Sequence, residues 1–147
     1  MKTVEQEIER LVRTAEGLEK YKKNLNRFSG FPDEIKDNEE IAKLAIKHNT
    51  YNIRDVSPRL RKDPKFNLFL LKEIKKDAAE KSNPDKWDML DYDEAILRLE
   101  DIHKPLLENR NFALLVVKKF SPVFKYISEK LRGDKEIARL ALENAGN

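Results

Sequence analysis

The sequence predicts an all-α fold in which two-helix repeats of about 25 residues stack behind an N-terminal helix. The first observation is a pattern that occurs four times: a large apolar residue, a helix-capping residue type three positions later, and another large apolar residue at position six. The second is that apolar residues then recur at helical spacing. Because one such helix cannot bury its apolar stripe alone, neighbouring repeats are expected to stack. The capping positions are Asn38, Asp63, Asn109 and Asp134.

The spacing of the pattern divides the chain. The four stretches begin at Ile35, Leu60, Leu106 and Leu131, so the first two and the last two are each 25 residues apart, and the middle interval is 46. That interval is close to two units but has a different sequence in its centre. The predicted organisation is a single helical domain over 1–147. It consists of an N-terminal helix (3–28), repeat pair one (31–82), an acidic aromatic insert (83–101) and repeat pair two (102–146).

The N-terminal helix is expected over residues 3–27. Thr3 and Gln6 form a capping-box pattern, and an apolar stripe runs from Val4 to Phe28 before Ser29-Gly30-Phe31-Pro32 ends the helix. This segment matches no repeat unit. It is expected to cover the exposed end of the repeat stack, and the alternative is a dimerisation helix.

Each repeat unit is expected to begin its long helix just after the capping residue, whose side-chain oxygen accepts a hydrogen bond from an orphan backbone N–H group. Pro64 directly follows Asp63, where a missing N–H group costs nothing. Position six should be buried in every unit. The four residues at this position are Ile41, Phe66, Phe112 and Ile137.

A turn at 82–85 leads into the insert, and Asp91 with Glu94 is expected to cap a helix that carries Ala95, Ile96, Leu99 and Ile102. Its aromatic and aliphatic residues stand among aspartates, as anchor residues of protein interfaces do. One hypothesis is that part of the insert is exposed and docks on a basic, apolar groove of a partner. The alternative is that it plugs the joint between the repeat pairs. The candidate partner-binding residues are Trp87, Asp88, Met89, Leu90, Asp91, Tyr92 and Asp93.

Two stretches resemble a known family. Residues 53–63 and 124–137 are similar to the repeats of the domain-of-unknown-function family numbered 4116, which share a Ser-x-x-Leu-Arg-x-Asp-x-Glu-Ile/Val core. The resemblance covers roughly 31–74 and 102–146. Leu107-Glu108 departs from the pattern in the third unit, and Phe120-Ser121 stands where the family tends to have Asn-Gly. The resemblance implies an all-helical fold and transfers no catalytic residue.

The composition argues against an enzyme. There is no cysteine, so thiolate chemistry is excluded, and there is no glycine-rich phosphate loop. His48 and His103 are the only histidines, neither has a second metal ligand of the right type at i+3 or i+4, and Glu100 with His103 alone is too few ligands for a metal site. We therefore expect no catalytic residue, no metal and no cofactor.

Charge is unevenly distributed. Residues 85–101 carry a net charge of −5, so the remaining chain carries +8. Basic residues at equivalent repeat positions would form rows that could neutralise phosphates, although acids are interleaved with them. Electrostatic nucleic-acid binding is therefore the alternative function. Its candidate residues are Lys22, Lys23, Arg59, Arg61, Lys62, Lys72, Lys118, Lys119 and Arg132.

Small helical repeat proteins without catalytic residues mostly bind other proteins. The leading functional prediction is a non-catalytic protein-interaction module. Its size and class suit a small inhibitor or adaptor of a larger partner, such as an anti-defence protein encoded by a phage or a mobile element. No apolar run approaches the roughly 20 residues that cross a bilayer, and no signal peptide is visible, which favours a cytoplasmic location.

Overall fold

The computed structural model describes residues 3–6 and 17–144, and within these ranges every regular element is a helix, which confirms the predicted all-α class. None of the helices in this part of the chain combines the length and the apolar character needed to cross a membrane. The chain divides into two compact units, residues 1–58 and 59–147, which are described separately.

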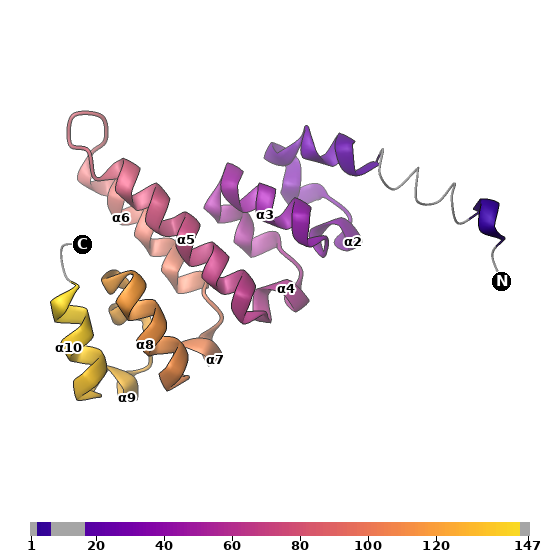
Figure 1. Cartoon of the computed structure of the whole chain (residues 1–147). Coiled ribbons are helices and arrows are strands. Elements are labelled where there is room, and N and C mark those ends of the chain that lie inside the picture. The colour runs from indigo at the N-terminus through magenta and orange to yellow at the C-terminus, as the bar shows by residue number, and fades with distance from the viewer. Residues whose placement is uncertain (1–2, 7–16, 145–147) are drawn as a thin grey trace. The chain divides into compact units, whose positions relative to one another are not determined.

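In its described part, the first unit contains a helical stretch over 17–22, the α-helices α2 and α3 (Figure 1) and the 3₁₀ elements η1 and η2. Its core is aromatic at one end, where Phe28 is fully buried. The ring centroids of Tyr21 and Phe31 are 4.7 Å apart, and those of Phe28 and Phe31 are 5.6 Å apart. The elements are η1 (Leu25–Gly30), α2 (Asp33–Lys36), α3 (Glu39–His48) and η2 (Thr50–Asp55).

The N-terminal helix ends earlier than the sequence pattern predicts. Residues 7–16 lie outside the described part, and the helical stretch over 17–22 gives way to a turn rather than continuing to Arg27. The side-chain amide of Asn24 donates to the carbonyl of Lys20 at 2.9 Å, and Asn24 itself has φ −126° and ψ 39°. An asparagine bonded to the preceding turn terminates the helix, and the following 3₁₀ segment turns Phe28 into the core.

Polar contacts fasten the elements of the first unit together. The Ser57 hydroxyl donates to Asp37 Oδ1 at 2.6 Å, and the Ser57 N–H donates to the Lys36 carbonyl at 3.2 Å. Lys22 Nζ lies 2.9 Å from a carboxylate oxygen of Glu40, which joins the 17–22 helix to α3. The end of η2 is thereby held against the end of α2.

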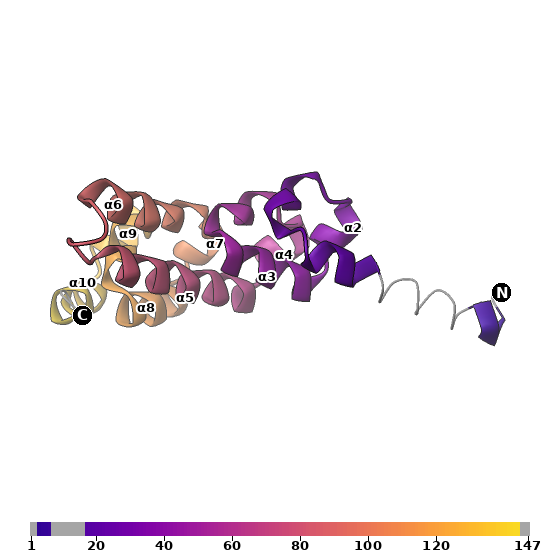
Figure 2. The same ribbon diagram turned by 90° about the horizontal axis from the view of Figure 1, so that it is seen from above.

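The second unit is built around a long helix, α5, and a shorter one, α6, that runs back along it (Figures 1 and 2). Helix α8 packs against α10 and against η4. The first helix, α4, starts at Pro58, the last residue of the first unit. The elements are α4 (Pro58–Lys62), α5 (Pro64–Lys81), α6 (Met89–Leu97), η3 (Arg98–Asp101), α7 (Lys104–Leu107), α8 (Arg110–Lys119), η4 (Ser121–Tyr126), α9 (Glu129–Arg132) and α10 (Lys135–Glu143).

All four predicted capping residues start a helix. The side-chain oxygen of each accepts a hydrogen bond from a backbone N–H group of the first turn, at 3.0 to 3.2 Å. The large apolar residue three positions after each cap is buried, as predicted. The exposed fractions are 0% for Ile41, 1% for Phe66, 8% for Phe112 and 0% for Ile137.

Two segments of the chain contain the same succession of elements. From α2 to α5, each element starts 71 residues before its counterpart in the succession from α7 to α10. The Ser57-to-Lys36 backbone bond has a counterpart in the bond from the Ser128 N–H to the Leu107 carbonyl, at 3.1 Å. We call residues 33–72 the first segment and 104–143 the second segment. Stacking of 25-residue units stays a prediction.

Candidate partner-binding surface

Helix α6 carries most of the predicted partner-binding residues, and it begins earlier than expected. The Asp91 N–H donates to Asp88 Oδ1 at 3.0 Å, and the Asp88 N–H donates to Asp91 Oδ2 at 3.1 Å. This reciprocal capping box makes Asp88 the N-cap and places Asp91 inside the first turn, so the prediction that Asp91 is the cap was wrong. Each of the two aspartates accepts a hydrogen bond from the orphan backbone N–H group of the other, which favours the earlier start.

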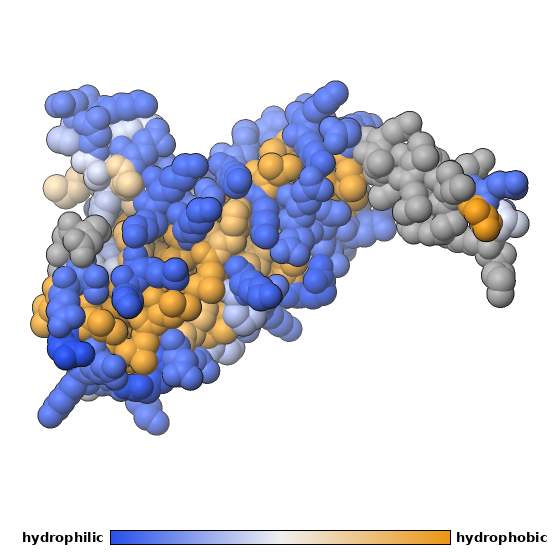
Figure 3. Space-filling model, viewed as in Figure 1, coloured by the Kyte–Doolittle hydropathy of each residue, from blue (hydrophilic) through white to orange (hydrophobic). Residues whose placement is uncertain are grey.

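One side of α6 presents large aliphatic residues to solvent. The exposed fractions are 78% for Met89, 74% for Leu90 and 42% for Leu97. Leu90 and Leu97 are seven residues apart, so they lie on the same side of the helix two turns apart. Asp93 and Glu94 lie between them. We call these five residues, Met89, Leu90, Asp93, Glu94 and Leu97, the α6 outer face. The surface around the α5–α6 turn is mainly hydrophilic (Figure 3, upper left).

The opposite side of α6 holds the helix in place. Ala95 is 4% exposed and Leu99, in η3, is fully buried. Because α6 already has a buried apolar stripe that packs along α5, the exposed leucines are a second apolar stripe. Leu97 was absent from the predicted partner-binding residues, because the apolar residues of this helix were expected to form a single buried stripe.

Trp87 lies at the turn before α6 and is half-buried. The ammonium groups of Lys81 and Lys86 lie 5.3 Å and 5.5 Å from its ring centroid, and its backbone N–H donates to the Asn83 carbonyl at 3.0 Å. The indole Nε1 is enclosed without a hydrogen-bond partner among the described residues. Trp87 therefore attaches the turn to the end of α5, whereas Met89 and Leu90 point outward.

Of the other predicted partner-binding residues, two are half-buried and two are exposed. Asp91 and Tyr92 are half-buried, and Asp88 and Asp93 are exposed. Part of the negative charge of the insert is neutralised internally. Arg98 is 2% exposed, and its guanidinium lies 2.8 Å from Asp101. The acids that remain exposed near the start of α6 give this end of the helix its negative character.

The basic residues of the alternative hypothesis occur in both compact units. In the first unit, Lys22 donates hydrogen bonds to the carboxylates of Glu40 and Glu19, which raises the pKa of Lys22, so its charge is already paired. In the second unit, Lys75 Nζ donates to the carbonyl of Lys119 at 2.8 Å, which brings α5 to the end of α8. The other candidates occupy α4 (Arg59, Arg61, Lys62), α5 (Lys72), the end of α8 (Lys118, Lys119) and the end of α9 (Arg132), with Lys23 in the turn after the 17–22 helix.

Neither histidine takes part in a cluster of metal-ligand type. In the part of the chain that the structure describes, no group of three or more His, Cys, Asp or Glu side chains could hold a metal ion. His48 ends α3, and the His103 N–H donates to Asn67 Oδ1 at 3.0 Å, where it fixes the start of α7 against α5.

Comparison with known proteins gives one family. The model of the family described as a domain of unknown function (DUF4116) matches residues 18–61 and 109–147. No curated protein and no solved structure matches the chain. The first match starts before the region of resemblance seen in the sequence and includes the end of the N-terminal helix, which the 25-residue pattern had left outside the repeats. The two matches together span more than half of the 147 residues, so the chain belongs to the DUF4116 family.

Proposed function

We propose that this protein is a non-catalytic protein-interaction module that binds its partner through the α6 outer face. The observation that supports this is the exposure of Met89, Leu90 and Leu97 on one short helix whose other side is already packed. Scattered exposed apolar residues are ordinary, but a contiguous group beside charged residues is typical of an interaction surface.

The energetics of such a contact are favourable. Burying apolar surface stabilises a complex by about 25 cal/mol for each Å², and central aliphatic or aromatic anchors dominate interface energies. The exposed carboxylate of Asp93, between the leucines, favours a partner whose apolar groove has a basic rim. Such charges raise the association rate and set specificity more than they add affinity.

The role that suits this arrangement is that of a small inhibitor or adaptor of a larger protein. An anti-defence protein encoded by a phage or a mobile element is one such role. The ionisable groups of the α6 outer face are the two carboxylates of Asp93 and Glu94, and the proposal is that binding itself is the activity.

The test is a photo-crosslinking experiment in cells of the native host. A photoreactive phenylalanine analogue at Leu90 should capture one dominant partner, because this side chain would lie at the interface. The same analogue at Leu115, which is 40% exposed on α8, is the matched control and should not capture that partner. Capture of the same protein from both positions, or none from Leu90, would contradict the proposal.

Electrostatic nucleic-acid binding is the second candidate. The observation that favours it is the contact of Lys75 in α5 with the carbonyl of Lys119 at the end of α8, which brings these two basic residues together. Lys72, Lys118 and Lys119 are exposed. Binding through such a group would weaken steeply with salt, because each phosphate contact releases counterions.

A further inference from the structure

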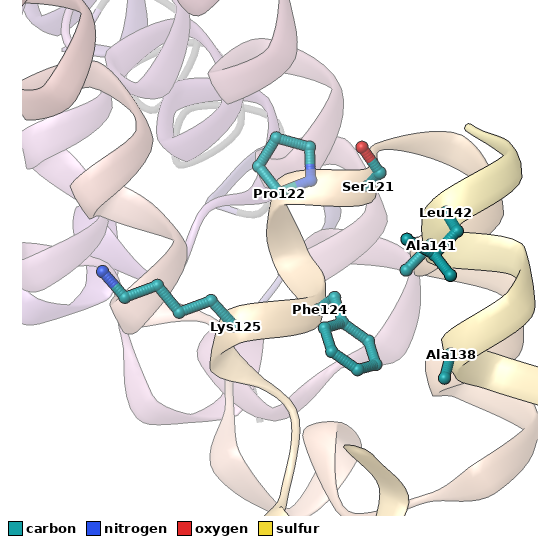
Figure 4. A pocket seen from close by; sticks show the side chains of 7 residues that line it. All are labelled: Ser121, Pro122, Phe124, Lys125, Ala138, Ala141 and Leu142. Atoms are coloured by element: carbon teal, nitrogen blue, oxygen red, sulfur yellow. The ribbon is translucent and has the colours of Figure 1, made fainter. Parts of the chain in front are cut away.

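A groove of about 510 Å³ lies between η4 and α10 in the second segment. Figure 4 shows the ring of Phe124 facing Ala138, Ala141 and Leu142 across it, while the ammonium group of Lys125 points away from α10. Apolar surface gathers over α8 and α10 in the space-filling view (Figure 3, lower left). Leu142 is 79% exposed, although it lies one turn from Ala138 on the same side of the helix.

The same side of the equivalent helix is covered. Helix α5 starts 71 residues before α10, so Asn67, Leu70 and Leu71 are the counterparts of Ala138, Ala141 and Leu142. These three α5 residues are 1%, 0% and 2% exposed. The corresponding sides of the two helices therefore differ: the side of α5 is buried, whereas the side of α10 lines an open groove.

The chain itself shows what covers this side of α5. Helix α6 and η3 pack along α5, and the His103 N–H that follows them donates to Asn67 Oδ1 at 3.0 Å. The covering segment buries Ala95, Leu99 and Ile102, which are spaced i, i+4 and i+7, and its other side carries acids among exposed aliphatic residues. An amphipathic helical segment is thus the structure that this type of surface accepts.

We propose that the η4–α10 groove binds an amphipathic helix of another protein, with small or aliphatic residues at i, i+4 and i+7 and acidic residues beside them. Apolar contacts with Phe124, Ala138 and Leu142 supply the affinity, in the manner of helix-in-groove recognition. Lys125 is the charged residue among those that line the groove, and its ammonium group, which points away from α10, favours acids on the outer part of the incoming helix. This site is separate from the α6 outer face and does not depend on it.

The size of the groove favours a single helix over a second copy of the chain. Seven residues line the groove, whereas a stable interface between two folded proteins takes roughly 20–30 residues from each side. Two to three turns of helix would fill the space beside α10, which is itself nine residues long.

The test uses a defined probe: a fluorescent peptide of residues 88–103, held helical by a lactam bridge between two outward positions. The full chain should bind it saturably in fluorescence anisotropy. Leu142→Asp should weaken binding at least tenfold, and so should Ala138→Phe, which fills the groove. Leu115→Asp is the matched control, since it adds the same charge at another exposed leucine, and it should leave the affinity unchanged. Circular dichroism should show unchanged helicity for every variant.

Three outcomes would overturn the proposal: no binding at millimolar peptide, binding that Leu142→Asp leaves unchanged, or equal loss in Leu115→Asp. Sedimentation equilibrium tests the other possible occupant of the groove, a second copy of this chain. A dimer that Leu142→Asp dissociates would assign the groove to a second copy and contradict a partner helix. Leu90→Asp should leave peptide binding intact, so failure at the α6 outer face and failure at the groove are distinguishable.

Discussion

Trp87 combines two opposing contributions to stability. Its ring is covered by the side chains of Lys81 and Lys86, while its enclosed indole N–H lacks a hydrogen-bond partner among the described residues. Cation–π contacts contribute about 0.5–1 kcal/mol at exposed sites, and an unsatisfied buried donor costs about 1–3 kcal/mol. The ring of Trp87 therefore stabilises the fold, whereas its indole N–H group destabilises it.

This balance predicts different effects of two substitutions. Trp87→Ala should lower the free energy of unfolding by about 2 kcal/mol, because the ring contacts are lost. Trp87→Phe should be neutral or slightly stabilising, because it keeps a ring and removes the orphan donor. Urea denaturation would measure both. Equal destabilisation by the two variants would show that the indole N–H is satisfied in solution.

The environment of Asp134 predicts how the stability of the fold changes as the pH falls. The Arg110 guanidinium, hydrogen-bonded to Asp134 at 2.8 Å, lowers the pKa of that carboxyl, and the N–H of Ile137 lowers it further. A carboxylate whose folded-state pKa lies below the unfolded value of about 3.9 stabilises the fold fully above that pH. This stabilisation is lost as the pH falls through the folded-state pKa.

Arg110→Met should therefore make stability less sensitive to acid. The decrease in the free energy of unfolding between pH 5 and pH 2.5 should be smaller in the variant than in the parent protein, because the pKa of Asp134 moves back toward its usual range. Urea midpoints across this range provide the measurement. Identical decreases in the two proteins would mean that the Arg110–Asp134 contact does not persist in solution.

At the scale of elements, helix starts were well predicted and helix ends less so. Asn38 and Asn109 could be identified as caps because the same local chemistry recurs around them. The end of the N-terminal helix at Lys22 depends on the side chain of Asn24 bonding backwards, which competes with an otherwise helical apolar stripe. The start of α6 was misplaced because Asp88 and Asp91 are both capping types, and only their reciprocal bonds decide between them.

The sequence predicted some residues of the α6 outer face and missed others, because it does not show how the insert packs against α5. The hypothesis that part of the insert is exposed named Met89 and Leu90, and both are exposed. It also named Trp87, which packs against Lys81 of its own chain. Leu97 was missed because α6 has apolar residues on two sides, and periodicity alone does not show which side faces α5.

The equivalence of α3 and α8 predicts comparable stability effects at corresponding sites. Ile41 and Phe112 each lie three residues after an asparagine cap and are buried. Ile41→Ala and Phe112→Ala should each lower the free energy of unfolding by about 3 kcal/mol, since each leaves a cavity. Chemical denaturation monitored by circular dichroism is the measurement. A cost below about 1 kcal/mol at either position would contradict the burial of that side chain.

For the whole molecule, the charge distribution predicts weak and salt-sensitive nucleic-acid binding at most. Lys75 of α5 and Lys119 of α8 lie together, but acids such as Asp77, which pairs with Lys81, are interleaved with the basic residues. Fluorescence anisotropy with duplex DNA and single-stranded RNA should show affinities that fall steeply between 50 mM and 200 mM salt. Submicromolar binding at physiological salt, abolished by Arg61→Glu with Arg132→Glu, would make nucleic-acid binding the leading function.

The central claim is that the α6 outer face binds a protein partner, and its most direct test is the affinity of that partner for Leu90→Asp with Leu97→Asp. Both side chains are exposed, so the variant should keep the melting temperature of the parent protein. Isothermal titration calorimetry against the crosslinked partner should show at least a 30-fold loss of affinity, about 2 kcal/mol, as for truncated anchor residues. Unchanged affinity in the folded double variant would contradict the account.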